Sequence, residues 1–355
     1  MDHTERGSFI IAPDEPILIT GATGFIGVRL IENLLNRGFR NLRCFVRPSS
    51  KIAKLESIVR RNGAGVQVVK GNLLSRDDCV TATKGVKVVF HLAAARGEKS
   101  FPDAFMNSGV TTRNLLEACV AHQCAGRFVN ISSFAVYTNR QKPQSGMLDE
   151  WCPTESCPQS LGDAYSFAKA KQDEIVTEYG KRFGVPYVIV RPGFVYGPGN
   201  LGISGRVGIG SFGVFLHLGG SNTIPLTYVD NCADAIALAG LQKGVDGQVF
   251  NVVDDDLPSS RQFLRLYKSN VRRFTSFYVP HALSYALCYV WEKYSLWSEG
   301  QLEPVYNRKK WHASWKRTRY SNKKIKTSLG WEPRISTDEG LRRYFQACRE
   351  ARANA

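Results

Sequence analysis

Short apolar runs alternate with longer amphipathic stretches along the first half of the chain. Six runs have the length and composition of buried strands, at residues 16–20, 42–47, 66–73, 87–94, 126–133 and 185–192. After the first run, apolar residues recur at helical spacing and Gly38 ends the pattern; they are Val28, Leu30, Ile31, Leu34 and Leu35. Strands and helices in alternation predict βαβ units and therefore a doubly wound parallel α/β sheet.

Two later segments have a different pattern. Residues 200–220 are rich in glycine, which is typical either of a mobile lid over substrate or of an ordinary surface loop. Residues 280–297 are apolar and aromatic apart from Glu292 and Lys293, and the segment is shorter than the ~20 residues that span a bilayer. We expect a helix that covers a substrate pocket, with a helix resting on a membrane surface as the alternative.

Composition sets the broad class. With 355 residues, 43% of them hydrophobic, the chain can bury one large α/β core and a smaller lobe. Its net charge is +16, and residues 301–326 contain nine Lys and Arg against the single acid Glu303. Nucleic acid, anionic lipid and anionic substrates would all suit such a charge, but a solvated basic face is the simpler interpretation, and we expect no nucleic-acid partner.

The cysteines and the first residues indicate the compartment. Nine cysteines show no zinc-like spacing: Cys119 and Cys124 are five apart, as are Cys152 and Cys157, and no histidine lies in register with them. The first residues form no apolar segment of the kind found in signal peptides. We therefore expect a cytoplasmic protein with reduced thiols and without a metal site.

A glycine pattern lies where the first predicted strand meets the first helix. Gly21, Gly24 and Gly27 form G-x-x-G-x-x-G, which allows a tight turn and close approach of the backbone to a pyrophosphate at a helix N-terminus. The loop also contains Thr23, Phe25 and Ile26. These residues predict a dinucleotide site.

The end of the second predicted strand bears on the choice of dinucleotide. A carboxylate there would bind the ribose hydroxyls of NAD, but the chain has Arg47, Ser49, Ser50 and Lys51 instead. These groups suit a 2′-phosphate. We therefore expect NADP to be preferred over NAD, with a solvated charge as the alternative role of Arg47.

Tyr165 and Lys169 are four residues apart, so that a helix would place a phenol and an ammonium on one face. A nearby cation favours the phenolate and lowers the pKa of a tyrosine from its usual value near ~10. Such a tyrosine can exchange a proton with a substrate oxygen.

Seven motifs carry a family resemblance over nearly the whole chain. They are TGATGFIG (20–27), HLAA (91–94), ISSFAVY (131–137), YSFAK (165–169), RPGFVYGPG (191–199), YVDNCADAIALA (228–239) and LGWEP (329–333). In this order they resemble the extended short-chain dehydrogenases/reductases, which include nucleotide-sugar epimerases and 3β-hydroxysteroid dehydrogenases. The resemblance implies a Rossmann-type domain over residues 14–192, with its sheet completed by later segments, and a smaller substrate-binding lobe mainly over 193–345.

The same resemblance assigns roles to particular residues. Tyr165 would be the general acid/base, Lys169 would bind the nicotinamide ribose, and Ser133 would hydrogen-bond the substrate oxygen, with Ser132 as the fallback. Asn72 stands where the family more often has an aspartate near the adenine. The remaining residues expected at the cofactor are Leu73, Leu92, Ala93 and Ala94. The resemblance also implies a homodimer formed through the helix that carries Tyr165.

Departures from the family pattern narrow the reaction. Phe134 and Ala135 follow Ser133 where dehydratases have an acidic pair, so we do not expect elimination of water. Phe194 replaces an asparagine of the sugar-nucleotide members, and "IPLTYVDN" lacks their arginine, which favours a less polar substrate. We expect Phe194, Tyr196 and Tyr228 to contact substrate, although Tyr196, Tyr228 and Asp230 also suit the core. His217 suits a packed or solvated position better than a catalytic one.

Three functions follow from these features. The first is interconversion of a secondary alcohol and a ketone by hydride transfer, in the manner of a 3β-hydroxysteroid dehydrogenase or a ketone reductase. The second is a nucleotide-sugar epimerase or reductase of polysaccharide biosynthesis. The third is a cofactor-binding protein without turnover, against which the presence of Ser133, Tyr165 and Lys169 argues.

Overall fold

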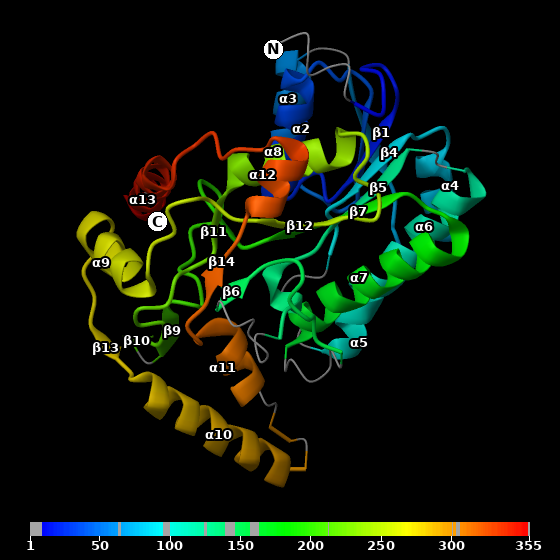
Figure 1. Ribbon diagram of the computed structural model, residues 1–355. Coiled ribbons are helices and arrows are strands. Elements are labelled where there is room, and N and C mark those ends of the chain that lie inside the picture. Colours follow the sequence, from blue (N-terminus) through cyan, green and yellow to red (C-terminus); the bar gives the residue numbers. More distant parts are fainter. Residues whose placement is uncertain are drawn as a thin grey trace.

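A computed structural model describes residues 9–62, 65–94, 100–123, 126–138, 146–156, 163–211, 213–299, 301–302 and 306–353. A seven-stranded sheet of parallel strands lies at its centre, in the order β12-β7-β5-β4-β1-β2-β3 (Figure 1). The strands are β1 Ile17–Thr20, β2 Leu42–Val46, β3 Val66–Lys70, β4 Val88–His91, β5 Arg127–Ile131, β7 Tyr187–Pro192 and β12 Val249–Val252. Each of the six predicted runs contains one strand, and the fold class is confirmed.

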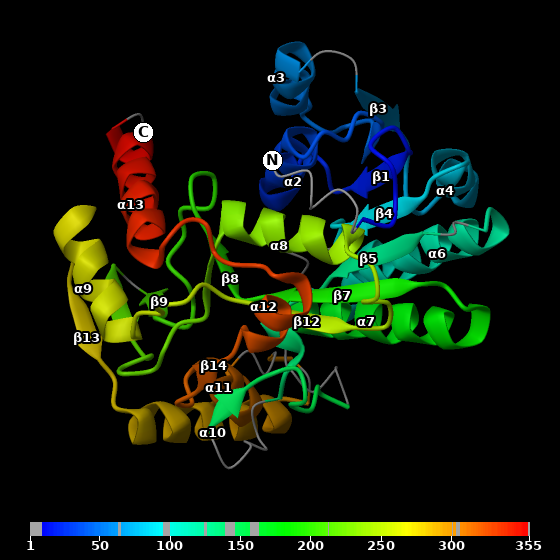
Figure 2. The same ribbon diagram turned by 45° about the horizontal axis from the view of Figure 1, so that its top comes forward.

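Helices cover both faces of the sheet, because strand residues alternate between the two sides. Ile17 and Ile19 of β1 belong to one apolar core, and Leu18 between them belongs to the other. The first core packs under α2 Phe25–Asn36, α3 Ala53–Asn62, α8 Val229–Leu241 and α12 Lys323–Leu329. The second packs under α4 Arg76–Thr83, α6 Thr111–Ala121 and α7 Ala164–Phe183 (Figure 2). Short α5 Phe101–Ala104 and a π-helical turn at Phe105–Val110 lead into α6.

Small sheets and helices form a second lobe. Its strands are β8 Phe194–Tyr196 and β11 Leu226–Tyr228; β9 Gly208–Ser211, β10 Val214–His217 and β13 Ser276–Tyr278; and β6 Met147–Leu148 and β14 Arg319–Tyr320. Its helices are a 3-10 turn at Phe134–Val136, α9 Ser260–Asn270, α10 His281–Trp297, α11 Arg308–Ser314 and α13 Thr337–Ala353. Between β11 and α9 the chain returns to the large sheet, where β12 pairs with β7 at its edge.

Two expectations about the lobe are corrected. The glycine-rich residues 200–220 are not an irregular loop throughout, because β9 and β10 pair antiparallel within them and β10 also pairs with β13. Residues 280–297 do form the expected helix α10, but most of its large apolar side chains are exposed, and Tyr285 and Trp291 are half-buried against Trp311 and Tyr306. Both features, the strand pairing and the side of α10 that is exposed, depend on residues far away in the sequence.

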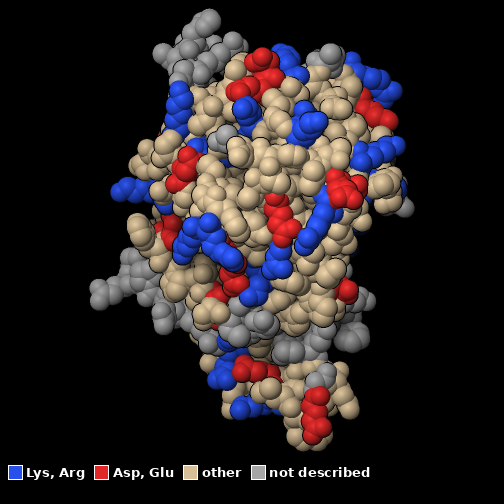
Figure 3. All heavy atoms as spheres, turned by 90° about the vertical axis from the view of Figure 1, so that its right-hand side faces the viewer, with Lys and Arg blue, Asp and Glu red and all other residues tan. Residues whose placement is uncertain are grey.

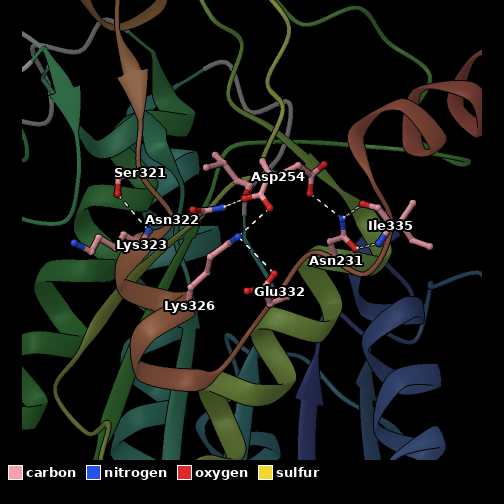
Figure 4. A network of polar contacts seen from close by, with 10 residues as sticks. Asn231, Asp254, Ser321, Asn322, Lys323, Lys326, Glu332 and Ile335 are labelled. Carbon is pink, nitrogen blue, oxygen red and sulfur yellow. Dashed lines mark hydrogen bonds and ion pairs between the residues drawn. The ribbon is translucent and has the colours of Figure 1, made fainter.

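A polar network fixes the last part of the chain to the end of β12 (Figure 4). Asp254 accepts hydrogen bonds from the Tyr228 backbone N–H (2.8 Å) and from Asn231 Nδ2 (2.9 Å). Asn231 in turn pairs with both backbone groups of Ile335, which donates to its Oδ1 at 3.0 Å. Burial raises the pKa of Asp254 to about 6. The network holds β11, α8 and the segment before α13 together beside the sheet.

Charged groups of both signs share the surface of the large domain. On the face in Figure 3, Lys and Arg side chains are interspersed with Asp and Glu, and they do not gather into one basic patch. The basic excess of the chain is instead concentrated in the sequence around α10 and α11, with twelve Lys and Arg and three Glu between residues 261 and 319.

Candidate active site

The loop between β1 and α2 needs its glycines for close packing. Gly21 has φ +70°, in the left-handed region that favours glycine. A Cβ on Gly27 would lie 2.3 Å from the carbonyl oxygen of Gly21, and one on Gly24 would lie 3.0 Å from the same oxygen. These backbone contacts leave no room for a methyl group, so the loop folds tightly against the first turn of α2.

The N-terminus of α2 is suited to an anion. Gly24 precedes the helix without a side-chain capping hydrogen bond, and the first turn of α2 has no acidic residue. Thr23 lies in the loop before this end, and Phe25 and Ile26 are the first two residues of the helix. The first N–H groups of a helix lack partners within the helix and carry its positive dipole. The cradle and the uncapped helix end together fit a dinucleotide pyrophosphate.

The other residues expected at the cofactor follow neighbouring strands. Because β4, β1, β2 and β3 are adjacent and parallel, their C-terminal ends share one edge of the sheet. Exposed Arg47 follows β2, and half-buried Leu92, Ala93 and Ala94 follow β4. Exposed Asn72 and buried Leu73 follow β3, where Asn72 Oδ1 accepts the Leu74 N–H at 3.0 Å. The amide oxygen of Asn72 therefore stabilises its own turn.

Helix α7 carries Tyr165 and Lys169. Asp163 caps the helix, since its Oδ1 accepts the Ser166 N–H at 2.7 Å. Tyr165 lies in the first turn and is 39% exposed, whereas Lys169 one turn later is buried. The helix thus places an exposed tyrosine one turn before a buried lysine.

Lys169 is held at the end of β5. Its Nζ donates to the carbonyl oxygen of Ile131 at 2.6 Å and to Gln172 Oε1 at 3.0 Å. Gln172 Nε2 donates in turn to Thr112 Oγ1 at 2.8 Å. Burial lowers the pKa of Lys169 to about 8, against the opposing effect of Asp173. The ammonium is therefore fixed in position and is charged at neutral pH.

A buried histidine extends this network to β4. His91 Nδ1 lies 2.9 Å from Thr20 Oγ1, and its Nε2 lies 2.9 Å from Thr112 Oγ1. Burial lowers the pKa of His91 to about 3, with Lys169 acting in the same direction. The ring is neutral at physiological pH, and it links the ends of β1 and β4 to α6. Its position in HLAA marked it in the sequence, but no role for it was predicted.

Asp173 is a second residue without a predicted role. It lies one turn beyond Lys169 on the buried face of α7, and its Oδ2 accepts hydrogen bonds from Ser132 Oγ at 2.9 Å and from Arg191 Nη2 at 3.0 Å. Burial raises the pKa of Asp173, and Arg191 opposes this shift. The i+4 spacing of an acid after Lys169 was visible in the sequence, but only the structure shows that this acid faces the core.

The two candidate serines differ in their surroundings. Ser132 is buried and bonded to Asp173. Ser133 is half-buried, and its Oγ accepts the Ala135 N–H at 3.1 Å at the start of the 3-10 turn. Because the hydroxyl of Ser132 is directed into the interior, the structure favours Ser133 as the serine of the site.

The expected substrate residues lie at different depths. Phe194 is half-buried and packs against the apolar core of the second lobe. Tyr196 and Tyr228 are only 0% and 2% exposed and pack against each other, so their burial favours the core alternative. Asp230 forms a 3.4 Å ion pair with Arg29. His217 is buried 3.0 Å from Ser260 Oγ, and burial lowers its pKa to about 4, as suits a packed neutral ring.

The described parts of the chain contain neither a disulfide nor a cluster of possible metal ligands. Seven cysteines there are free thiols, whereas Cys124 and Cys157 lie outside the described residues. Burial raises the pKa of Cys44 to about 12. Within the same parts, no three His, Cys, Asp or Glu side chains form a group that could hold a metal ion.

Comparisons with known proteins agree with this geometry. The family model of the NAD dependent epimerase/dehydratase family matches residues 17–252. Among solved structures, the UDP-glucuronic acid 4-epimerase of Bacillus cereus, in complex with UDP-glucuronic acid and NAD, superposes with a TM-score of 0.71 at 22% identity, covering 95% of this chain and 99% of that chain. The UDP-glucose 4-epimerase of Thermus thermophilus with NAD gives a TM-score of 0.67 at 22% identity over the same shares of both chains.

Relatives by sequence differ in how much they align. A trifunctional UDP-glucose 4,6-dehydratase/epimerase/reductase of Arabidopsis thaliana is 28% identical over 66% of this chain, which spans only 36% of that protein. The 2-alkyl-3-oxoalkanoate reductase of Stenotrophomonas maltophilia is 28% identical over 92% of this chain and 97% of its own. A 3β-hydroxysteroid-dehydrogenase/decarboxylase of Arabidopsis thaliana is 24% identical over 92% and 78%. The chain therefore belongs to the NAD dependent epimerase/dehydratase family, within the extended short-chain dehydrogenases/reductases.

Proposed function

We propose that the protein is an NADP-preferring oxidoreductase that interconverts a ketone and a secondary alcohol on an apolar substrate. The observation that carries the substrate class is Phe194, whose half-buried ring packs on the core of the second lobe where sugar-nucleotide members have an amide. The two relatives that align over 92% of this chain support the proposal, since their names specify a 3-oxoalkanoate and a 3β-hydroxysteroid.

The residues of the site divide the work of a proton-coupled hydride transfer. The cofactor, when bound, would supply the hydride as NADPH in reduction and accept it as NADP⁺ in oxidation. Tyr165 donates its phenolic proton to the carbonyl oxygen as the hydride reaches the carbonyl carbon, which gives the alcohol and a phenolate. The Ser133 hydroxyl donates a hydrogen bond to the same oxygen. The Lys169 ammonium, held by Ile131 and Gln172, favours the phenolate and binds ribose hydroxyls.

Dehydration is a poor fit to the residues that follow Ser133. Phe134 is buried and stacks on Tyr320 with 5.5 Å between ring centroids. Ala135 has no ionisable group. Because an elimination needs an acid and a base beside the tyrosine, and these positions supply neither, the proposed reaction ends with the alcohol.

Cofactor choice, location and assembly complete the proposal. Exposed Arg47 at the end of β2 supports NADP, since a guanidinium binds a 2′-phosphate and the segment has no carboxylate.

Free thiols in the described residues support a cytoplasmic location. The adjacent helices α6 and α7 could pair with the same helices of a second copy to form a homodimer.

A second candidate is a nucleotide-sugar epimerase. It is supported by the family model and by the solved epimerases that share the fold. An epimerase returns the hydride to its substrate and so keeps its cofactor. Stoichiometric NAD released on denaturing the purified protein would favour this candidate, and an empty protein that binds NADPH more tightly than NADH would favour the first.

A substrate panel tests the proposed function. NADPH oxidation is followed at saturating cofactor with a 2-alkyl-3-oxoalkanoate, a 3-ketosteroid, UDP-glucose and UDP-glucuronic acid. We expect turnover of the apolar ketones, and a lower kcat/KM for them in Phe194→Asn. The matched control is Phe183→Asn, because Phe183 is 50% exposed at the far end of α7. Turnover of nucleotide sugars alone would overturn the proposal.

A further inference from the structure

Helix α10 has its apolar side outward. The side chains that it buries against the lobe are small and mostly polar, namely Ser284, Cys288 and Ser295. Its exposed residues include Leu283 (52% exposed), Val290 (62%) and Trp297 (76%). A helix on the surface of a water-soluble protein normally has the opposite arrangement, because burying apolar area is what stabilises its packing.

The exposed apolar side chains form a continuous stripe. They recur at alternating spacings of four and three residues, so that they share one face of the helix: Leu283, Leu287, Val290, Tyr294 and Trp297. Phe277 and Tyr278 of β13 are also exposed just before the helix. Among the exposed residues of α10, all of which the structure describes, Lys293 is the one charged side chain. We call the five apolar residues of the stripe, together with Phe277 and Tyr278, the α10 surface.

The α10 surface lies at the edge of the molecule. Figures 1 and 2 both show α10 as the element farthest from the α2 and α3 end, with α11 between it and the rest of the lobe. The segment that contains α10 and α11 is hydrogen-bonded to the rest of the lobe at the end of α11. Arg206 Nη1 donates to the carbonyl oxygen of Ala313 at 2.6 Å, and Trp315 Nε1 donates to the carbonyl oxygen of Gly205 at 3.1 Å. Arg308 binds both carboxylate oxygens of Glu292. The helix is therefore held as a rigid projection with its apolar side facing away.

The sequence on both sides of α10 has an excess of basic residues, which favours an anionic partner. The flanking sequence from 261 to 319 contains twelve Lys and Arg and three Glu, and one of these acids, Glu292, is already paired with Arg308. The Arg308 guanidinium also lies 4.8 Å from the centroid of the Tyr289 ring. Two copies meeting through this surface would bring together two segments with the same excess of positive charge, which is unfavourable. An anionic surface with an apolar interior complements both features.

We propose that the α10 surface docks onto an anionic lipid bilayer. With 17 residues α10 is shorter than a membrane span, so it lies in the plane of the interface with its leucines and valine among the acyl chains. Tyr294 and Trp297 are the residue types enriched at the level of the headgroups. Arg and Lys side chains beside the helix contact the lipid phosphates, and the stem of Lys293 carries its ammonium to the same level.

The segment that contains α10 and α11 also contacts residues that neighbour the candidate active site. Lys309 of α11 forms a 3.8 Å ion pair with Glu155, whose neighbour Thr154 bridges to Tyr137. Tyr137 ends the 3-10 turn that begins at Ser133. Docking of α10 on a bilayer would therefore act on a segment that contacts the site, and a substrate dissolved in the bilayer is the kind that this arrangement suits. This last consequence rests on the proposed function, whereas docking itself does not.

Vesicle co-flotation tests the proposal without any substrate. The full-length protein is mixed with vesicles of phosphatidylcholine containing 30% phosphatidylglycerol, chosen as the probe, or of phosphatidylcholine alone. We expect binding to the anionic vesicles and at least about tenfold weaker binding to the neutral ones or in 0.5 M salt. In the double variant Leu287→Glu/Val290→Glu, binding should fall by about 100-fold, since each buried apolar side chain accounts for roughly tenfold.

A matched control and a second measurement keep the outcomes distinct. Val80→Glu/Phe183→Glu places the same two charges on exposed residues of α4 and α7, 40% and 50% exposed, and should bind vesicles as the wild type does. Circular dichroism and NADPH binding show whether each variant is folded. No binding by the folded wild type, or equal binding by the double variant, would overturn the proposal. A change of oligomeric state in the double variant, measured by analytical ultracentrifugation, would instead show that the surface joins two copies and would also overturn it.

Discussion

Replacing Gly27 by alanine should remove cofactor binding, and the structure gives the size of the effect. The added Cβ would lie 2.3 Å from the Gly21 carbonyl oxygen and 3.0 Å from Ala22 Cα, both of them backbone atoms that no side-chain rotation can move. In a helix interior, alanine would otherwise be more stable than glycine by about 0.5–1 kcal/mol. Forced displacement of packed groups costs about 1–3 kcal/mol, so Gly27→Ala should destabilise the protein on balance.

The displaced atoms belong to the cradle itself, so affinity should suffer more than stability. We expect NADPH binding, followed by the quenching of tryptophan fluorescence, to weaken at least about tenfold, and the Tm to fall by a few degrees. Gly202→Ala is the matched control, because a Cβ there meets no atom within 4 Å and Gly202 is not among the residues with positive φ. If Gly27→Ala bound NADPH and melted as Gly202→Ala does, the close packing of the loop would not be what shapes the cofactor site.

The remaining predictions concern three charged residues. Burial lowers the pKa of Lys169 to about 8, so its side chain is charged below that pH and loses its charge above it. NADPH affinity should therefore fall as pH rises from 7 to 9. Lys169→Met should weaken NADPH binding and abolish this pH dependence, as fluorescence titrations at each pH would show. Arg47→Asp should weaken NADPH binding about tenfold or more and leave NADH binding equal or improved, and an unchanged ratio of the two affinities would contradict the role of Arg47. Asp173→Asn leaves the buried guanidinium of Arg191 without its carboxylate. This change should lower the free energy of unfolding, measured by urea denaturation, by about 3–5 kcal/mol. A loss below about 1 kcal/mol would show that the ion pair is not needed for stability.

Local sequence patterns were sufficient for the large domain. Each predicted strand run contains a strand, because a buried parallel strand is apolar along its whole length and needs no knowledge of its neighbours. The positions of the glycines and of Tyr165 and Lys169 follow from spacing alone. β12 was not singled out among the strand runs, since its four residues are too few for a pattern and it joins the sheet only by pairing with β7.

Features set by distant contacts could not be predicted. The glycine-rich segment became β9 and β10 because β13, some 60 residues later, pairs with β10. The composition of residues 280–297 indicated an apolar, aromatic helix but not which side would face the lobe, where Ser284 and Cys288 are buried between half-buried aromatic rings. Asp173 appeared as one more charge on a helix, and its meeting with Ser132 and Arg191 depends on the order of the strands. In each case the missing information was a tertiary contact.

The most direct test of the proposed chemistry follows the hydride and the proton together. Wild-type protein and Tyr165→Phe are each given NADPH deuterated at the transferred position and a 2-alkyl-3-oxoalkanoate, and the product is examined by mass spectrometry. We predict one deuterium on the carbinol carbon with the wild type, and in Tyr165→Phe a kcat/KM lower by about 10²–10⁴ with NADPH affinity nearly unchanged. Full activity of Tyr165→Phe, or an alcohol without deuterium, would contradict proton donation by Tyr165 coupled to hydride transfer from NADPH.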